Sequence, residues 1–252
     1  MTPGWQKLLE QLEPVSQSHK LSDKIYNMLR KAVDFTPDTV DEFKEEQHVL
    51  NQILLAHIDF REDPQHGNFG DMFGRYMEET KQTSERTGQF FTPMNVVKMM
   101  TKISMSELTH DTPIQYCSDP AAGCGRMMLK TAEHYQETLG YYNFLFNNVD
   151  IDKRMYTYCT MNAILYSIPS VNIWGNSISN EYWEGFVVLK PIGLPTQWHY
   201  LDKEKVQAFR MEFKRKKQGL DNFIEGDIAE PKAKRERPRN YKAKPVQKGL
   251  FR

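Results

Sequence analysis

The sequence predicts an α/β fold built around a parallel sheet. Short apolar segments alternate with helical ones from residue 113 onward, and one of them runs into the glycine turn Gly123–Gly125 and then a helix. A pair of acids, Asp150 and Asp152, follows the next such segment about 30 residues later. Alternation of strand, loop and helix is typical of a parallel sheet.

The net charge of zero hides an uneven distribution along the 252 residues. Residues 1–202 hold 17 basic and 26 acidic side chains, whereas residues 203–252 hold 16 basic and 7 acidic ones. This asymmetry indicates an extension that binds a polyanion. We therefore expect a basic, partly disordered tail over 203–252. The spacing of apolar residues described below divides the rest of the chain into a helical region over 1–85 and an α/β domain over 86–202.

Several classes of protein are excluded by composition. No run of about 18 apolar residues is present, so we expect no transmembrane helix, and the first residues lack the apolar core of a secretory signal. Three cysteines, Cys117, Cys124 and Cys159, are too few for a disulfide framework and lack metal-ligand spacing with the scattered histidines. We expect a cytoplasmic protein without metal.

The first part of the chain has the spacing of amphipathic helices. Apolar residues recur at three- and four-residue steps from Trp5 to Phe60, which predicts two or three helices broken near Pro37. Another helical pattern covers 69–79. A further helix is expected after Thr92 as N-cap and Pro93 as first helical residue, with an apolar stripe of Val96, Met100 and Ile103.

The second part alternates strands with helices. Helices are predicted over 126–139 and 153–167, and strands over 113–118, 144–149, 171–174 and 186–189. The loop that opens with Asp119 and contains Gly123 and Gly125 would present backbone N–H groups at the carboxyl end of the sheet. Taken singly, the glycines could merely shape a turn and Asp150 and Asp152 could be solvated charges. Both features in this order favour a ligand site.

Three ordered motifs resemble a known family. Thr87-Gly88-Gln89-Phe90-Phe91-Thr92-Pro93, Asp119-Pro120-Ala121-Ala122-Gly123-Cys124-Gly125 and Val149-Asp150-Ile151-Asp152 are similar to motifs of the N6-adenine DNA methyltransferases. The resemblance covers roughly residues 60–192 and is strongest to the methylation subunits of type I restriction-modification systems. It implies a doubly wound, mostly parallel, Rossmann-like sheet with S-adenosylmethionine across the carboxyl ends of its strands.

The resemblance also implies roles for individual residues. Phe91, Thr92 and Pro93 would flank the methionine part of the cofactor, and Asp150 would bind its ribose. The loop would bind the amino-acid end through Asp119 and Gly123, with Ala121 and Gly125 in the same cofactor-binding set. Asn176 stands where the family has an acid beside the adenine N6, and an amide oxygen could accept the same hydrogen bond.

The family's catalytic Asn-Pro-Pro-aromatic motif is not found. Aligning 186–189 with the strand that precedes it puts Lys190, Pro191 and Ile192 at that position. A lysine ammonium has no acceptor for a target amino group, and an isoleucine has no π face to stack on a flipped base. None of the 13 prolines follows an Asn or another Pro. The sequence therefore predicts weak or absent methyl transfer.

The expected partners are DNA and a specificity or recognition subunit, as the resemblance implies. A flexible basic tail could contact phosphates non-specifically, and a solubilising role explains it equally well. The candidate contacts are Lys234, Arg235, Arg237, Arg239, Lys242 and Lys244. Two functions stay open: an adenine-N6 DNA methyltransferase of a restriction-modification system, or an inactive cofactor- or nucleic-acid-binding relative with a regulatory role.

Overall fold

A computed structural model describes residues 2–12, 21–34, 41–81, 91–105, 107–190, 194–213 and 215. The chain divides into two compact units, Met1–Met211 and Glu212–Arg252. Every element described below belongs to the first unit. Within the described ranges, no helix has the length and apolarity needed to cross a membrane. The basic residues predicted to contact nucleic acid, from Lys234 to Lys244, lie outside these ranges.

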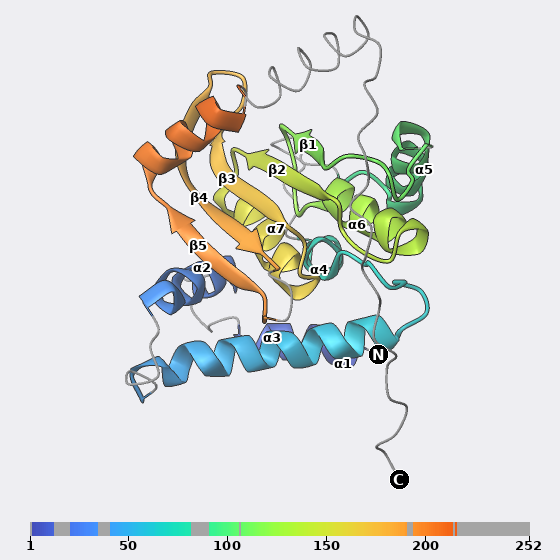
Figure 1. Cartoon of the computed structure of the whole chain (residues 1–252). Helices are drawn as coiled ribbons and strands as arrows, with labels where there is room; N and C mark the ends of the chain where they lie inside the picture. The colour runs from blue at the N-terminus through green and yellow to red at the C-terminus, as the bar shows by residue number, and fades with distance from the viewer. Residues whose placement is uncertain are drawn as a thin grey trace, which may run out of the picture. The chain divides into compact units, whose positions relative to one another are not determined.

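A five-stranded sheet forms the centre of the first unit, in the order β1-β2-β3-β4-β5 (Figure 1). Strands β1 (Gln115–Asp119), β2 (Phe144–Asp150) and β3 (Ser170–Asn176) are parallel, and helices α6 (Arg126–Thr138) and α7 (Lys153–Leu165) connect them. Strands β4 (Glu181–Leu189) and β5 (Gln197–Leu201) are antiparallel additions. The α/β class is confirmed, with a mixed sheet that is parallel only in its first three strands.

The direction of β4 corrects one expectation. The sequence alignment treats 186–189 as a strand parallel to the others, whereas β4 forms a hairpin with β3, pairing Asn176 with Glu181 and Ser170 with Val188. Only residues 177–180 connect the two strands, and a parallel crossover needs a dozen or more residues. The end of β4 therefore lies at the amino end of β3.

This hairpin also relocates Lys190, the first residue after β4. It lies at the opposite edge of the sheet from Asp119 and Asp150, where its Nζ donates to the carbonyl oxygen of Leu194 at 3.1 Å. The placement of Lys190 at the position of a catalytic motif beside the glycine loop is therefore wrong. Pro191 and Ile192 lie outside the described residues.

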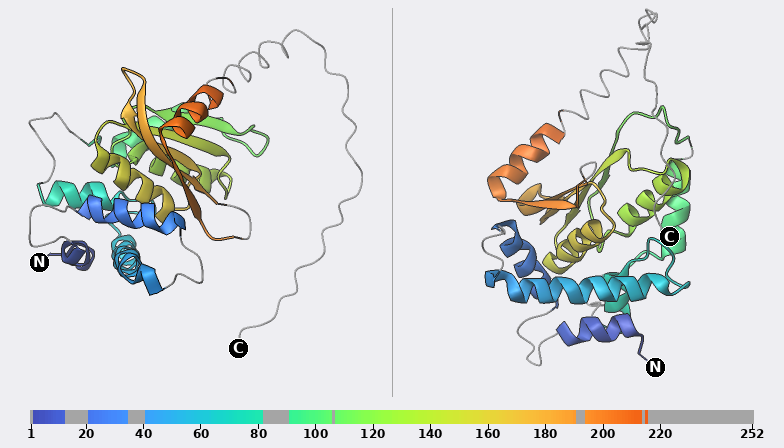
Figure 2. Two further views of the ribbon diagram at one scale, coloured as in Figure 1. Left: turned by 90° about the vertical axis from the view of Figure 1, so that its left-hand side faces the viewer. Right: turned by 60° about the horizontal axis from the view of Figure 1, so that its bottom comes forward.

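The helices before the sheet share its main core. They are α1 (Gly4–Leu12), α2 (Leu21–Lys31), the 3-10 turn η1 (Ala32–Asp34), α3 (Lys44–Glu62) and α4 (Met72–Glu79). Figure 2 shows α1 beside the long α3, and both belong to the group of helices that covers one face of the sheet. Trp5, Ile53 and Phe73 of these helices are buried in one cluster with Met155 of α7 and Phe186 of β4. The predicted helical region therefore has no core separate from the sheet.

Both faces of the sheet are covered. Phe144 and Phe146 of β2 pack with α6 and α7, while Val149 belongs to a cluster that includes Val206. Alternate residues of a strand point to opposite faces, so the helical segment 203–211, which carries Val206, covers the second face.

Helix α5 (Met94–Ser104) differs from the sequence-based expectation in two ways. Its N-cap is Pro93, with no side-chain capping bond, and Thr92 lies one residue earlier. The helix buries Val97 and Thr101, whereas Ile103 of the predicted stripe is 69% exposed. Of the elements in the described part of the chain, α5 packs mainly against α6, which covers only one narrow face of the helix.

Candidate functional site

Three polar residues end the three parallel strands. Asp119 is the last residue of β1, Asp150 of β2 and Asn176 of β3. Parallel strands present their carboxyl ends at one edge, so the three residues predicted to bind a ligand lie along the same edge. In the register of the sheet, Asp119 pairs with Asn148 and Asp150 pairs with Trp174.

The glycine loop after β1 requires both of its glycines. Gly123 and Gly125 have φ of +55° and +87°, in the left-handed region that side chains with a Cβ rarely adopt. Gly125 caps α6, and a Cβ there would lie 2.9 Å from the Cys159 Sγ. A Cβ on Gly123 would meet nothing closer than the Phe91 ring at 3.7 Å. The loop is thus tightly packed behind Gly125 and open at Gly123.

Asp150 connects its strand to the glycine loop. Its Oδ2 accepts the Gly123 N–H at 2.8 Å and its Oδ1 accepts the Asp152 N–H at 2.8 Å. Burial raises the pKa of the Asp150 carboxyl, and the two N–H donors partly oppose that shift. Each oxygen keeps a second lone pair. The carboxylate can therefore accept two more hydrogen bonds from a ligand, for example from vicinal hydroxyl groups.

Asp152 has a different task, although the sequence pattern treats it like Asp150. Its Oδ1 accepts the Arg154 N–H at the start of α7, and its Oδ2 lies 2.9 Å from Arg154 Nη2. This side chain caps a helix and forms an ion pair. Asp152 is therefore a structural residue at the start of α7, and not the solvated charge that was the alternative to a ligand site.

Asp119 opens the glycine loop. Its Oδ1 accepts the Ala121 N–H at 3.0 Å, which fixes the first turn of the loop. Burial raises the pKa of the Asp119 carboxyl, and the Ala121 N–H partly opposes this shift. The carboxyl keeps its Oδ2 for a cationic or hydrogen-bond-donating ligand group. Ala121 itself is exposed beside it.

The acceptor of Asn176 is already used within the protein. Its Oδ1 accepts the N–H groups of Ile178 at 3.0 Å and Ser179 at 3.2 Å in the turn between β3 and β4. These two bonds occupy both lone pairs of the amide oxygen. Asn176 can therefore offer its Nδ2 as a donor to a ligand, rather than the oxygen that the sequence-based reasoning assigned to an amino group.

The segment before α5 lies against the glycine loop. The Phe91 ring is the nearest group to Gly123 on its open side, and the Arg126 guanidinium lies 4.5 Å from the centre of that ring. The Thr92 carbonyl oxygen accepts from Arg126 Nη1 at 3.1 Å. Phe91 and Thr92 thus lie beside the glycine loop, and Pro93 is the N-cap of α5.

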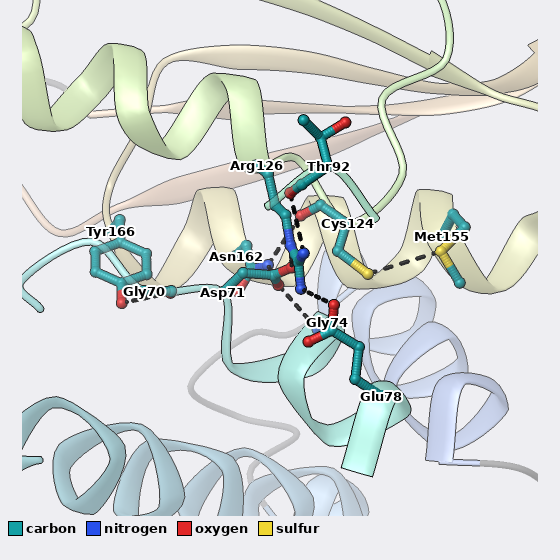
Figure 3. Close-up of polar contacts among 10 residues, drawn as sticks. All are labelled: Gly70, Asp71, Gly74, Glu78, Thr92, Cys124, Arg126, Met155, Asn162 and Tyr166. Atoms are coloured by element: carbon teal, nitrogen blue, oxygen red, sulfur yellow. Dashed lines mark hydrogen bonds and ion pairs between the residues drawn. The ribbon is translucent and has the colours of Figure 1, made fainter. Parts of the chain in front are cut away.

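A buried ion-pair network behind the loop was missed by the sequence-based reasoning. Arg126 contacts Asp71 and Glu78, and Asn162 of α7 donates to Asp71 (Figure 3). The one available signal was an arginine directly after the glycine loop, at the first position of an otherwise amphipathic helix. Its partners lie about 50 residues earlier, which a local pattern does not reveal.

The described residues contain no group of three or more histidine, cysteine or acidic side chains able to hold a metal ion. Cys117, Cys124 and Cys159 are free thiols. The edge of the sheet instead combines two carboxylates, one amide donor, an open glycine and an aromatic ring. This combination suits a neutral or cationic organic ligand with hydroxyl groups better than a polyphosphate, since two carboxylates repel a polyanion.

Known proteins resemble this chain in sequence or in fold. A family model described as N-6 DNA Methylase matches residues 65–211, more than half of the chain. A search of curated proteins finds no match. Among the solved structures that match, two are similar over 66% of this chain.

The first solved structure, from Listeria monocytogenes, is described as a class I S-adenosylmethionine-dependent methyltransferase. It matches with a TM-score of 0.44 and 10% identity. The second is a type I restriction-modification methyltransferase subunit from Streptococcus thermophilus, with a TM-score of 0.32 and 22% identity. The matched part spans 50% and 34% of these two chains. The region matched by the family model contains the glycine loop and all three strand ends.

Proposed function

Because this chain belongs to the N-6 DNA methylase family, we propose that it binds S-adenosylmethionine at the carboxyl edge of β1, β2 and β3 and serves adenine-N6 methylation of DNA. The observation that carries the proposal is the position of Asp150. This carboxylate accepts the Gly123 N–H, and each of its oxygens keeps one lone pair for a ligand. A ribose with two adjacent hydroxyl groups matches that capacity.

The other residues of the edge fit the same cofactor. Asp119 would bind the ammonium of its amino-acid end, and Phe91 with Thr92 would flank the methionine chain on the open side of Gly123. Asn176 would donate from Nδ2 to a ring nitrogen of the adenine. S-adenosylmethionine supplies an activated methyl group when bound. The role of these side chains is to hold and orient it.

A second candidate function is cofactor binding without methyl transfer. Lys190 lies at the edge of the sheet away from the glycine loop, and none of the 13 prolines follows an Asn. The described residues at the loop edge would thus supply cofactor contacts, but they include no Asn-Pro-Pro-aromatic group for a target base. Transfer of a methyl group would need acceptors from outside the described residues.

DNA binding is proposed on the basis of charge. Residues 203–252 hold 16 basic side chains against 7 acidic ones. Six of the basic residues, Lys234, Arg235, Arg237, Arg239, Lys242 and Lys244, would contact phosphates. Six such contacts would give a slope of up to about −5 in log affinity against log salt. A specificity subunit would then supply recognition of a particular sequence.

Calorimetric titration with S-adenosylmethionine tests the cofactor proposal. We expect Asp150→Asn to weaken binding about 10- to 100-fold, because it removes the charge from the ribose acceptor and leaves one amide oxygen where there were two carboxylate oxygens. Asp152→Asn is the matched control: it neutralises the neighbouring carboxylate and keeps an N-cap residue on α7. Absent binding, or equal affinity of the wild type and Asp150→Asn, would contradict the proposal.

Transfer of a labelled methyl group to DNA decides between the two candidate functions. Incorporation by the wild-type protein that is lost in Asp150→Asn supports the methyltransferase. Cofactor binding without incorporation, both alone and with a cognate specificity subunit, supports the second candidate. Deletion of residues 231–252 is expected to reduce DNA affinity and to flatten its salt dependence.

A further inference from the structure

Arg126 occupies an unusual place for a charged residue. It is the first residue of α6, directly after Gly125, and its side chain is 9% exposed. A positive charge at a helix N-terminus opposes the helix dipole, and a buried charge loses its hydration. Because both effects are unfavourable, the guanidinium needs strong compensation from its neighbours.

Each part of the guanidinium has a partner (Figure 3). Nε donates to Asp71 Oδ2 at 2.7 Å, Nη2 to Glu78 Oε1 at 2.9 Å, and Nη1 to the Thr92 carbonyl oxygen at 3.1 Å. Burial alone would lower the pKa of Arg126, but Asp71 and Glu78 outweigh it and raise the pKa overall. Arg126 is therefore held as a cation that joins α4, α6 and the segment before α5.

Asp71 is itself fixed to the glycine loop. Its Oδ1 accepts the Gly74 N–H at 2.9 Å and Asn162 Nδ2 at 3.0 Å. The same Asn162 Nδ2 lies 2.9 Å from the Cys124 carbonyl oxygen, in the middle of the loop. Asn162 thus links Asp71, the side chain that holds Arg126, to the glycine loop. Asp71 is almost fully buried.

Arg126, at one end of this network, contacts the segment that lies on the open side of the glycine loop. Arg126 binds the Thr92 carbonyl and lies 4.5 Å from the centre of the Phe91 ring. That ring is the nearest group to the open face of Gly123. Apart from this anchor, α5 packs mainly on α6 and exposes much of its apolar surface. The Phe91 ring also packs against the buried core cluster that includes Phe73 and Met155, and Arg126 adds a polar contact at the neighbouring Thr92 backbone.

We propose that Arg126 is a positioning residue for the cofactor: with Asp71 and Asn162 it sets Phe91 and Thr92 at a fixed distance from the glycine loop before the ligand binds. This inference rests on the proposed function. A segment that is ordered in advance loses less conformational entropy on binding, so Arg126 contributes to affinity without reaching the ligand itself.

The test compares Arg126→Lys with Arg75→Lys. Arg75 is the matched control because it lies on α4, forms an ion pair with Glu79 at 2.7 Å and is half exposed. A lysine keeps the charge at position 126 but cannot serve three separate acceptors in one plane. We expect Arg126→Lys to weaken S-adenosylmethionine binding about 10-fold, the effect of one lost charge-assisted hydrogen bond. Amide exchange over residues 91–97 should accelerate, while Arg75→Lys changes neither quantity.

A second variant separates positioning from fold stability. Arg126→Met alone would leave Asp71 as a buried, unpaired charge, which is strongly destabilising. The double variant Asp71→Asn with Arg126→Met removes both charges and keeps an N-cap residue on α4. If Arg126 only stabilises the fold, this double variant regains wild-type cofactor affinity. If Arg126 positions Phe91 and Thr92, affinity stays reduced although the unfolding midpoint recovers.

Wild-type affinity in both Arg126→Lys and the double variant overturns the inference. If the wild-type protein binds no S-adenosylmethionine, the proposed function fails, and exchange of the ligand-free protein then decides the positioning role separately. Unchanged exchange over residues 91–97 in Arg126→Lys rejects that role, and faster exchange confined to these residues supports it.

Discussion

Replacing Gly125 by alanine is expected to destabilise the protein by about 2–4 kcal/mol. The backbone there has φ +87°, and a left-handed conformation costs an L-residue roughly 1–2 kcal/mol. The new Cβ would also lie 2.9 Å from Cys159 Sγ and 3.0 Å from Met128 Cε. Overpacking of this kind costs about 1–3 kcal/mol, and the stiffer unfolded chain returns about 0.4–1 kcal/mol.

Gly140→Ala is the matched control for this substitution. Gly140 has φ +77°, but a Cβ there would meet nothing within 4 Å. It should therefore show only the cost of the backbone conformation, about 1 kcal/mol. Urea unfolding followed by tryptophan fluorescence measures both variants, and the difference between them is the steric share.

The contact with Cys159 gives a further check. Cys159→Ala removes the Sγ that the new methyl group would meet, so it should cost less in the Gly125→Ala background than in the wild type. Equal stability of Gly125→Ala and Gly140→Ala, or additive effects of the Gly125 and Cys159 substitutions, would refute the packing argument.

Two predictions concern titration and thiol chemistry. Burial, and secondarily Arg61, lowers the pKa of His57 to about 4, so protonation favours the unfolded chain, whose histidine titrates near 6.5. Because of this group alone, the free energy of unfolding should fall by about 2 kcal/mol between pH 7.5 and pH 5. Urea unfolding should show a smaller fall in His57→Gln. Burial also raises the pKa of Cys117 to about 11 and those of Cys124 and Cys159 well above their ordinary value. At pH 8 a thiol reagent should react slowly with the native protein, whereas in urea it should react with all three thiols. Rapid labelling of Cys124 or Cys159 before unfolding would contradict their burial.

The features that the sequence predicts well are those determined by neighbouring residues. The glycine loop is an example, because the left-handed conformations at Gly123 and Gly125 are a local requirement that glycine meets. The strand ends at Asp119 and Asp150 were also predicted, because a strand followed by a loop and a helix constrains where the carboxyl edge lies.

The features that were missed depend on partners far along the chain or on competition for one atom. The apolar pattern of β4 is compatible with either strand direction, and only its pairing with β3 shows that it is antiparallel. The periodicity of α5 predicts a helix, but the buried face depends on which element packs against it. At Asn176 the adjacent turn uses the amide oxygen that residue type alone left available. The role of Arg126 becomes clear only from its contact with Asp71, which lies far away in the sequence.

The register of the parallel strands limits the shape of a ligand that can contact all three strand ends. Each of β2 and β3 extends two residues beyond the residue paired with the end of the strand before it, so the three terminal side chains form a staircase. With strands about 4.8 Å apart and a rise of about 3.3 Å per residue, the Cα atoms of Asp119 and Asn176 lie roughly 16 Å apart along its diagonal. A ligand that touches all three steps must be elongated, with its hydroxyl groups at the middle step. A nucleoside that bears a chain at one end has this form, whereas a compact metabolite would reach only two steps.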